Sequence, residues 1–312
     1  MLQENLSNAK KAEALFFDRV VDIRAEDGHI PLEADLRRAT RVDPKSPSDF
    51  RIDPKMSAIL DRGASELFIN AVAHRPGGRV LDICCGPGWL ALELGRRGQQ
   101  VDAYDLSPKA IALAKRMLAE NPFKDGFGEV NYYLQDVTEL DLGENTYDSV
   151  SGWSAFHHLP DLDRFMKRVW RALRPGGVLA TMDDMPQGRL EKGLEYCAKF
   201  LLPIYTLTYS QKVSLAVRRL LGKSAFPEEV FSPMEEAKHS TVHDIARIWH
   251  DQYEVVIEFQ QNAFAHTPAM MLSGPDSFRY PAARAVLALD ALLCRLGIVR
   301  GFERIMIARK PL

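Results

Sequence analysis

Short apolar segments alternate with amphipathic ones between residues 79 and 184, and this alternation limits the fold of the 312-residue chain more than any other feature. Each apolar segment has the length of a strand, and the segments between them place apolar residues at helical spacing. Parallel strands need long crossover connections, which helices usually supply. The pattern predicts an α/β fold with a doubly wound, mostly parallel sheet. The expected strands lie within residues 79–85, 99–107, 130–136, 147–153 and 178–184.

The segments on either side of this core give the expected domain organisation. Two further strands, near the end of the sequence, bring the predicted sheet to seven. A helical stretch after the fifth strand interrupts the alternation, and we expect a lid there because long excursions from a compact domain are often binding elements. The expected boundaries are 1–75 for an N-terminal helical arm, 76–184 for the core, 185–241 for the helical lid insertion and 242–312 for completion of the sheet, with an excursion at 261–301.

Local patterns give finer expectations about single helices. Ser107 and Pro108 have the residue types typical of a helix N-cap and first turn. The other expected helical segments are 10–22, 56–73, 89–98, 162–177 with a glycine pair at its end, 190–209, 211–222 and 243–251.

Composition and charge exclude several classes of protein. Hydrophobic residues make up 46% and charged residues 26%, which is typical of a globular protein, and the net charge of -2 gives no general attraction to nucleic acid. Four cysteines are too few for a disulfide framework, so we expect reduced thiols in the cytoplasm. The first residues lack the apolar region of a signal peptide, and the most apolar stretch, 200–210, is too short to span a membrane. We therefore expect no stable membrane insertion.

Two features point to a ligand with an adenosine part. Gly86 and Gly88 follow the first strand, where small residues let the backbone approach a ligand at the carboxyl edge of the sheet. Asp105 ends the second strand, where a carboxylate can accept the hydroxyl protons of a ribose. The loop alone also fits the degenerate dinucleotide fingerprint, so a nicotinamide-dependent oxidoreductase remains an alternative at this point.

The remaining motifs resemble those of one family. Asp82 lies within the first strand, Gln135-Asp136-Val137 follows the third, and Leu173-Arg174-Pro175-Gly176-Gly177 precedes the fifth. Together with the glycine loop and Asp105, they resemble the class I S-adenosylmethionine-dependent methyltransferases. The resemblance implies a Rossmann-like seven-stranded sheet whose last strand is antiparallel, and S-adenosylmethionine as the cofactor. The chain departs from the family pattern at Cys84, which stands where the first glycine is usual.

The resemblance also implies a role for each matched residue. Asp105 would hold the ribose, Leu106 would pack on the adenine, and Asp82 would lie near the ammonium group of the donor. Asp82 has the alternative of capping the following loop, and Asp105 and Asp136 have the alternative of turn residues. The other cofactor-binding residues implied are Cys84, Gly86 and Gly88 for the methionine part, and Asp136 and Val137 for the adenine.

The segment after the fourth strand holds the candidates for catalysis. His157 and His158 each have a side chain that can take a proton from an attacking hydroxyl or amine near neutral pH, and we favour His157. A histidine at a helix start that is hydrogen-bonded to backbone is the alternative for both. Trp153 is expected in the wall of the cofactor pocket.

Other candidates contact the acceptor. Asp183 and Asp184 end the fifth strand at the same edge and could orient an acceptor; a metal site is the minor alternative, and we expect none. His239 lies where the chain returns from the insertion, and Tyr205 lies within it. Aromatic side chains expected around the pocket are Phe16, Phe17, Phe50, Tyr205, Tyr209 and Phe231.

These observations predict an S-adenosylmethionine-dependent O- or N-methyltransferase acting on a small molecule, a secondary metabolite or a sugar or glycan, of the bacterial type. One alternative is a lipid-linked acceptor at a membrane surface, and another is a non-catalytic scaffold that binds the donor. Residues 185–312 carry 16 Lys and Arg against 13 Asp and Glu, a surplus too small to indicate lipid binding. We expect their apolar faces to be buried against the sheet or in a homodimer.

Overall fold

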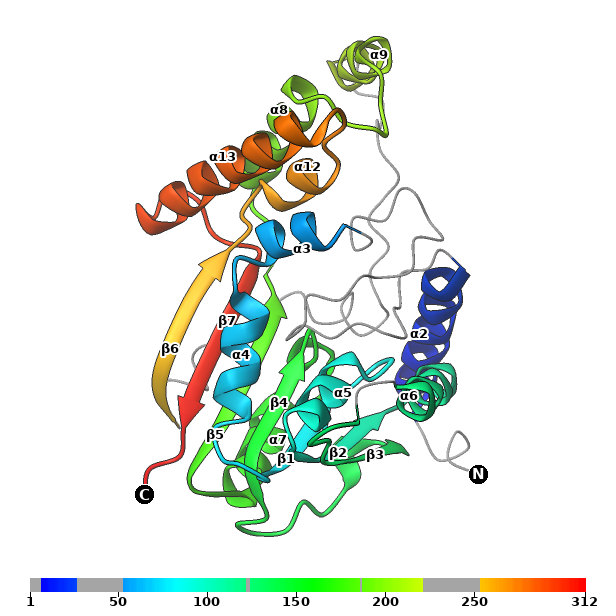
Figure 1. The fold of residues 1–312 in the computed structure, drawn as a ribbon, viewed down its shortest axis with the longest axis vertical. Helices are drawn as coiled ribbons and strands as arrows, with labels where there is room; N and C mark the ends of the chain where they lie inside the picture. Colours follow the sequence, from blue (N-terminus) through cyan, green and yellow to red (C-terminus); the bar gives the residue numbers. More distant parts are fainter. Residues whose placement is uncertain (1–6, 27–52, 122–123, 186, 221–252) are drawn as a thin grey trace.

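A seven-stranded sheet forms the centre of the protein (Figure 1). The computed structural model describes residues 7–26, 53–121, 124–185, 187–220 and 253–312. The strand order is β3-β2-β1-β4-β5-β7-β6, and β7 is antiparallel to both of its neighbours. The predicted doubly wound sheet with an antiparallel last strand is confirmed. The strands are β1 Arg79–Ile83, β2 Gln100–Asp105, β3 Glu129–Leu134, β4 Tyr147–Trp153, β5 Leu173–Asp184, β6 Glu254–Gln261 and β7 Glu303–Arg309.

Helices cover both faces of the sheet. Apolar residues of α4 (Ala64–Val72), α5 (Trp89–Arg96) and α6 (Pro108–Glu120) pack on one face. On the other face, α7 (Leu162–Ala172) inserts Phe165, Met166 and Val169 among buried residues of β1 and β4. These layers fix the carboxyl ends of β1, β2, β3 and β4 side by side.

A second group of helices lies beyond the carboxyl ends of β6 and β5, at the top of Figure 1. It consists of α3 (Pro54–Asp61), α8 (Arg189–Leu201), α9 (Tyr209–Leu220), α12 (His266–Met270) and α13 (Asp276–Arg295). An apolar cluster that includes Met56, Leu272 and Leu287 joins α3, α8, α12 and α13. The insertion and the excursion therefore pack together rather than separately.

Local sequence signals explain where several helices begin and end. Ser107 Oγ accepts a hydrogen bond from the backbone N–H of Ala110 at 3.0 Å and Pro108 occupies the first turn of α6, as predicted. The segment 56–73 forms two helices instead of one, because Arg62 and Gly63 adopt left-handed backbone angles of φ 53° and 80°.

Two predicted helices are shorter than expected. The predicted helix 162–177 ends at Ala172, because Pro175 removes a backbone donor and disfavours the helical conformation of Arg174; residues 173–177 instead begin β5. The segment 190–209 is helical only to Leu201, since Pro203 follows. The predicted helix at 243–251 lies outside the described residues.

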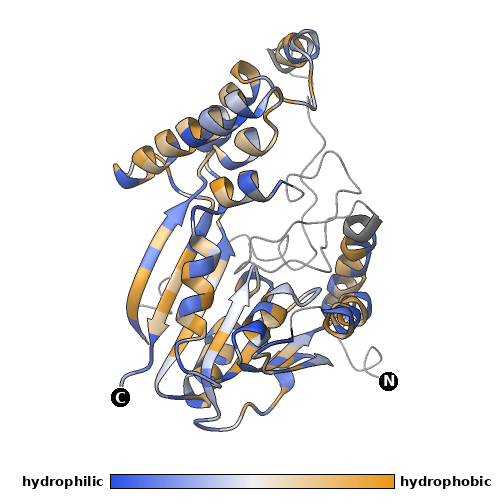
Figure 2. Cartoon of the chain, in the orientation of Figure 1, coloured by the Kyte–Doolittle hydropathy of each residue, from blue (hydrophilic) through white to orange (hydrophobic). Residues whose placement is uncertain are grey.

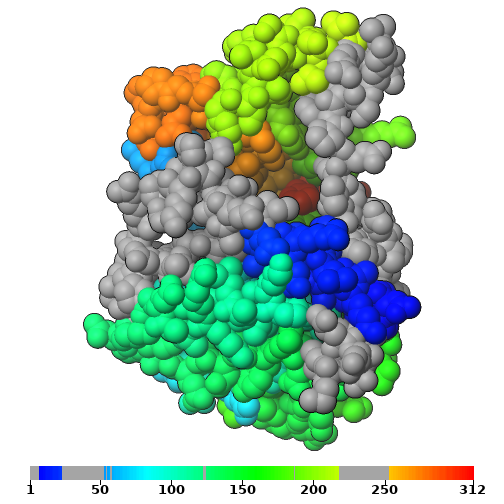
Figure 3. All heavy atoms as spheres, turned by 90° about the vertical axis from the view of Figure 1, so that its right-hand side faces the viewer, coloured from blue at the N-terminus to red at the C-terminus, as the bar shows by residue number. Residues whose placement is uncertain are grey.

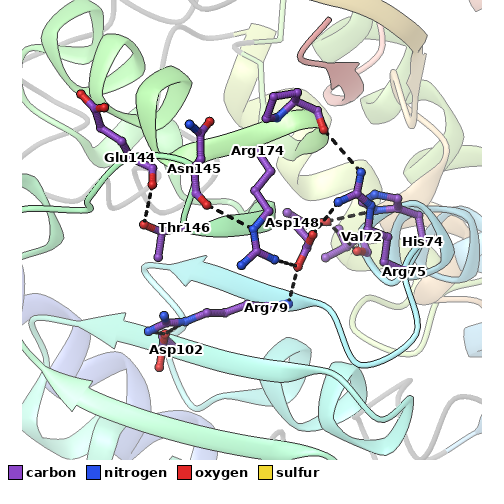
Figure 4. A network of polar contacts seen from close by, with 12 residues as sticks. Val72, His74, Arg75, Arg79, Asp102, Glu144, Asn145, Thr146, Asp148 and Arg174 are labelled. Atoms are coloured by element: carbon purple, nitrogen blue, oxygen red, sulfur yellow. Dashed lines mark hydrogen bonds and ion pairs between the residues drawn. The ribbon is translucent and has the colours of Figure 1, made fainter. Parts of the chain in front are cut away.

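Asp148, near the start of β4, connects several segments at the amino edge of the sheet, opposite the carboxyl ends of the parallel strands (Figure 4). Its carboxylate accepts the backbone N–H of Arg79 at 2.9 Å and the guanidinium groups of Arg75 at 2.8 Å and Arg174 at 2.6 Å. Burial alone raises the pKa of Asp148, but these donors outweigh burial and lower it below the usual value. This network is structural and leaves the carboxyl edge for a ligand.

Candidate functional site

The loop between β1 and α5 brings backbone to the carboxyl edge with little side-chain bulk. Gly86 and Gly88 have φ of 53° and 81°, and a Cβ atom on Gly88 would lie 2.6 Å from the ring of Tyr132. Cys84 also has a positive φ, of 49°, although it carries a side chain. Burial raises the pKa of the Cys84 thiol well above its usual value, so the side chain is a neutral, compact group in the pocket wall.

Asp105 ends β2 beside this loop and is held by backbone donors. Its two carboxylate oxygens accept the N–H groups of Gly86 and Ser107, each at 2.8 Å. Burial raises the pKa of Asp105, although these two hydrogen bonds lower it in part. A carboxylate has about four acceptor positions, so Asp105 can still accept from a ligand in the pocket that it lines.

Asp136 follows β3 and lines the same pocket. Its Oδ1 caps the short helix η3 (Val137–Glu139) by accepting the N–H of Thr138 at 3.0 Å, which is the local turn considered from the sequence. Its Oδ2 is paired with the ammonium group of Lys10, from the helix α2 (Asn8–Glu26). Asp136 thus connects the sheet edge to the N-terminal arm.

One pocket brings these residues together at the carboxyl edge of the sheet. Its floor comes from the ends of β1, β2 and β3, and one wall comes from α2, which packs against α6 and lies beside it in Figure 3. Of the predicted cofactor residues, Cys84, Gly86, Asp105, Leu106, Asp136 and Val137 line the pocket; the others that line it include Lys10, Glu13, Ala14, Phe17, Tyr104, Gln135, Ser154 and His158.

The contribution of Lys10, Glu13 and Ala14 was not predicted from the sequence. These residues and Phe17 recur at three- or four-residue intervals and therefore share one face of α2. That spacing is the one signal that could have identified them. Nothing in the sequence indicates that this face lies over the ends of β2 and β3, so only Phe17 was among the expected aromatic residues.

His157 and His158 lie in the short helix η4 (Phe156–His158), each paired with a carboxylate. Nδ1 of His158 is 2.8 Å from Oε1 of Glu13, and its ring meets Phe17 edge-on at 5.2 Å, so His158 belongs to the pocket wall. Nδ1 of His157 is 2.8 Å from Oδ1 of Asp183, and this ring is buried and does not line the pocket.

Asp183 makes internal contacts. Its Oδ1 also accepts the backbone N–H groups of Phe156 at 3.0 Å and His157 at 3.3 Å, and its Oδ2 accepts from Thr181. The side chain therefore fixes the position of η4. Its neighbour Asp184, the last residue of β5, accepts a hydrogen bond from Ser154 Oγ at 3.4 Å.

Asp82 is buried directly behind the loop. Its Oδ1 accepts from Ser151 Oγ at 3.1 Å, but its Oδ2 has no hydrogen-bond partner among the described residues. Burial raises the pKa of Asp82 to about 8, the nearby Asp105 carboxylate adds to this, and the Ser151 hydrogen bond opposes it. A buried carboxylate oxygen without a partner fits a ligand that brings a cationic donor to this loop.

The other predicted residues lie apart from the pocket. Trp153 ends β4 and packs edge-on against Trp89 and Phe68, both at 5.2 Å, on the face covered by α4 and α5. Tyr205 is exposed between α8 and α9. His239, Phe50 and Phe231 lie outside the described residues. Within the described ranges, no group of three or more His, Cys, Asp or Glu side chains could hold a metal ion.

Comparison with known proteins identifies the class of this core. Residues 80–177 match the family described as a methyltransferase domain, a segment that contains Asp82, the glycine loop, Asp105, Asp136 and both histidines. This part of the chain is a class I S-adenosylmethionine-dependent methyltransferase domain, which confirms the resemblance stated from the motifs.

Individual relatives share this core but not the whole chain. The demethylmenaquinone methyltransferase of Desulfitobacterium hafniense is 31% identical over 133 residues, 41% of this chain and 51% of that protein. The ubiquinone biosynthesis O-methyltransferase of Xanthomonas oryzae pv. oryzae is 31% identical over 154 residues, 48% of this chain and 62% of that protein. The chain therefore spans about half to three fifths of the length of these curated relatives.

Two solved structures share the fold over nearly the whole chain. The [4+2]-cyclase SpnF aligns with a TM-score of 0.52 at 14% identity, covering 97% of this chain and 96% of its own. Geranyl diphosphate C-methyltransferase from Streptomyces coelicolor A3(2) aligns with the same score and identity, covering 97% and 98%. One is named as a cyclase and the other as a methyltransferase, so the shared fold does not define the reaction.

Proposed function

We propose that the protein is an S-adenosylmethionine-dependent methyltransferase that acts on a small molecule. The observation that carries the proposal is the placement of Asp105 and Asp136 at the ends of adjacent strands in one pocket, next to a loop that contains Gly86 and Gly88. The methyltransferase relatives and the matched domain support the same class of donor.

The residues of the pocket would bind the donor in three places. Asp105 would accept from the ribose hydroxyl groups while keeping its bonds to Gly86 and Ser107. Asp136 would accept from the adenine amino group beside Lys10, with Leu106 and Val137 against the ring. The unpartnered oxygen of Asp82 would face the ammonium group.

S-adenosylmethionine, when bound, supplies a methyl group for an in-line displacement, so the main tasks of the protein are orientation and removal of a proton. We propose that His158 contacts the donor, because it lines the pocket near Asp105. His157 is buried and does not line the donor pocket, so as a base it would have to act on an acceptor held outside that pocket. A proton on Nδ1, directed at Asp183, would leave Nε2 as an acceptor, and Asp183 would then be a positioning residue.

The acceptor would be recognised by the parts of the chain outside the core. Among the described residues, none from α8 or α9 lines the donor pocket. We therefore propose that the 185–241 insertion closes over the acceptor rather than the donor. The small-molecule acceptors in the names of the relatives support this class of acceptor without identifying it, and whether the methylated atom is O, N or C stays open. All four cysteines lie in the described ranges and are free, which supports a reducing, cytoplasmic setting.

Calorimetric titration with S-adenosylmethionine tests the proposal. The wild type should bind one donor molecule, and Asp105→Asn should weaken binding by about 1–3 kcal/mol because it removes a charged acceptor. Asp125→Asn, in an exposed turn before β3, is the matched control and should bind as the wild type. Equal affinity of Asp105→Asn and the wild type, or preferential binding of a nicotinamide dinucleotide, would refute the donor assignment.

Transfer of a radiolabelled methyl group to a size-fractionated cell extract tests the reaction. Label in a low-mass fraction supports a small-molecule acceptor. Donor binding without transfer to any fraction would favour the alternative of a non-catalytic scaffold.

A further inference from the structure

The helix α13 has one buried face and one exposed apolar face. Tyr280, Ala283, Leu287 and Asp290 are buried against the helices around it. The opposite side is called here the outer face of α13, and Figure 2 shows hydrophobic residues along the length of this helix. Its large apolar side chains, with their exposed fractions, are Phe278 at 41%, Leu289 at 50%, Leu292 at 52% and Leu296 at 62%, and Ile298 follows at 53%.

The spacing of these residues places them on one side of α13. Phe278, Leu289, Leu292 and Leu296 are separated by 11, 3 and 4 positions, so at about 100° per residue they fall within one stripe along the helix. The sequence predicts that this apolar segment is buried against the sheet or in a homodimer; in the single chain one side of the helix is buried and the outer face is exposed. Leu289, Leu292 and Leu296 lie three and four positions apart, and a group of exposed apolar side chains such as this favours a partner.

Two described arginines lie beside the outer face. Arg284 and Arg295 lie along one flank of the stripe, and neither forms an ion pair with a described residue. The two acidic residues of α13 are engaged elsewhere: Asp276 pairs with Arg279, and Asp290 is buried and accepts the N–H groups of Ala263 and Phe264. The outer face therefore combines apolar side chains with uncompensated cations.

A shallow groove between α3 and α13 lies next to this flank. Its charged lining among the described residues is Lys55, Arg62 and Arg284, and Arg62 lies 3.8 Å from the buried carboxylate of Asp290. The rest of its lining is small or apolar: Ala58, Ile59, Leu287, Ala288 and Ala291.

We propose that the outer face of α13 docks on the surface of an anionic lipid bilayer. A helix with an apolar stripe and cationic flanks lies in the plane of the headgroups, where the stripe enters the acyl boundary and the cations meet lipid phosphates. A second copy of the chain in an antiparallel isologous contact fits less well, because Arg284 and Arg295 would lie against the same flank of the other copy. None of the described helices is long and apolar enough to cross a membrane, so the contact is peripheral.

The orientation of α13 gives this docking a defined geometry. The helix lies beyond the carboxyl ends of the parallel strands, the end of the sheet that carries the candidate site (Figure 1). Docking would therefore bring this end of the molecule toward the bilayer. The inference is independent of methyl transfer, since no residue of the outer face lines the donor pocket.

Cosedimentation of the full chain with vesicles tests the proposal. Vesicles of phosphatidylcholine mixed with an equal part of phosphatidylglycerol should bind the protein, and vesicles of phosphatidylcholine alone should bind it about tenfold more weakly or less. Leu289→Gln with Leu292→Gln should reduce binding about tenfold or more, because two apolar contacts are lost. Leu67→Gln, on an exposed position of α4, is the matched control and should bind as the wild type.

The flank is tested separately. Arg284→Gln with Arg295→Gln should weaken binding to the anionic vesicles about tenfold or more and leave binding to phosphatidylcholine unchanged. Thermal melts and donor titration of each variant establish that the fold is intact. Absence of wild-type binding, or equal binding by the leucine variant, would overturn the proposal. Sedimentation equilibrium measures the oligomeric state. If the wild type is a dimer, the leucine variant is a monomer and neither binds vesicles, the outer face belongs to an interface with a second copy instead.

Discussion

Replacing Asp82 by Asn should make the protein more stable at neutral pH without changing its stability in acid. The carboxyl group is buried, with one oxygen bonded to Ser151 and the other without a partner among the described residues. Its pKa is about 8 in the folded protein against 3.8 for the free group, so the folded state holds the proton that the unfolded chain releases. Asn has the shape of the protonated acid and keeps an oxygen for Ser151.

The sign and size of the effect follow from proton linkage. Below about pH 4 both the folded and the unfolded protein hold the proton on Asp82, so the side chain does not disfavour folding. As the pH rises toward 8, the unfolded chain releases this proton while the folded protein keeps it, and the protein loses stability. Each pH unit in this window changes the free energy of unfolding by about 1.4 kcal/mol. Between about pH 4 and pH 7, the advantage of Asp82→Asn should therefore grow by about 4 kcal/mol.

Urea unfolding of both proteins over this pH range measures the difference, with Asp125→Asn as a control that should show no trend. A constant difference between wild type and Asp82→Asn would refute the reasoning. Donor binding adds an independent readout, because an ammonium group beside Asp82 would ionise it. Titrations at neutral pH in two buffers of different ionisation enthalpy should detect a released proton in the wild type that is missing in the variant.

Other predictions concern the loop, the amino edge and the histidines. Cys84→Gly should stabilise the protein by up to about 1 kcal/mol in thermal melts, because a side chain in the left-handed region costs about 1–2 kcal/mol and Gly loses more backbone entropy. The same change at the buried neighbour, Cys85→Gly, should destabilise it, and the opposite order would contradict this explanation. Asp148→Asn should lower the free energy of unfolding by about 2–4 kcal/mol at neutral pH, while Glu144→Gln, exposed nearby, should not. Because the folded pKa of Asp148 lies below the usual value of 3.8, this loss should shrink as the pH falls below that value, and a pH-independent loss would argue against the ion pairs. In steady-state kinetics, His158→Ala should mainly raise KM for the donor and His157→Ala should mainly lower kcat; the reverse pattern would exchange the two roles.

The sequence predicts those residues of the site that lie at the end of a strand or in the turn directly after it. The glycine loop follows β1 directly, Asp105 ends β2, and each position is fixed by the period of its own strand and the turn after it. Parallel pairing alone then places these strand ends at one edge of the sheet, because β1, β2 and β3 align in register.

The remaining part depends on contacts between distant segments. Lys10 reaches Asp136 across 126 positions of sequence, and Glu13 reaches His158 across a longer interval. The face of α2 is amphipathic in any case, so its pattern carries no information on which surface it covers. For α13, a run of apolar residues predicts burial, whereas which side is buried depends on how the surrounding helices pack.

The position of β7 determines the order in which the sheet can be completed during synthesis. β7 follows β6 in the chain but lies between β5 and β6, so β6 leaves the ribosome before the strand with which it pairs. The five strands from β3 to β5 can associate earlier, with the outer edge of β5 still open. An open edge is a template for pairing with another chain, so a nascent protein is at greatest risk of aggregation in the interval between β5 and β7. A translational pause within residues 185–302 would lengthen that interval, and chaperone dependence should increase with it.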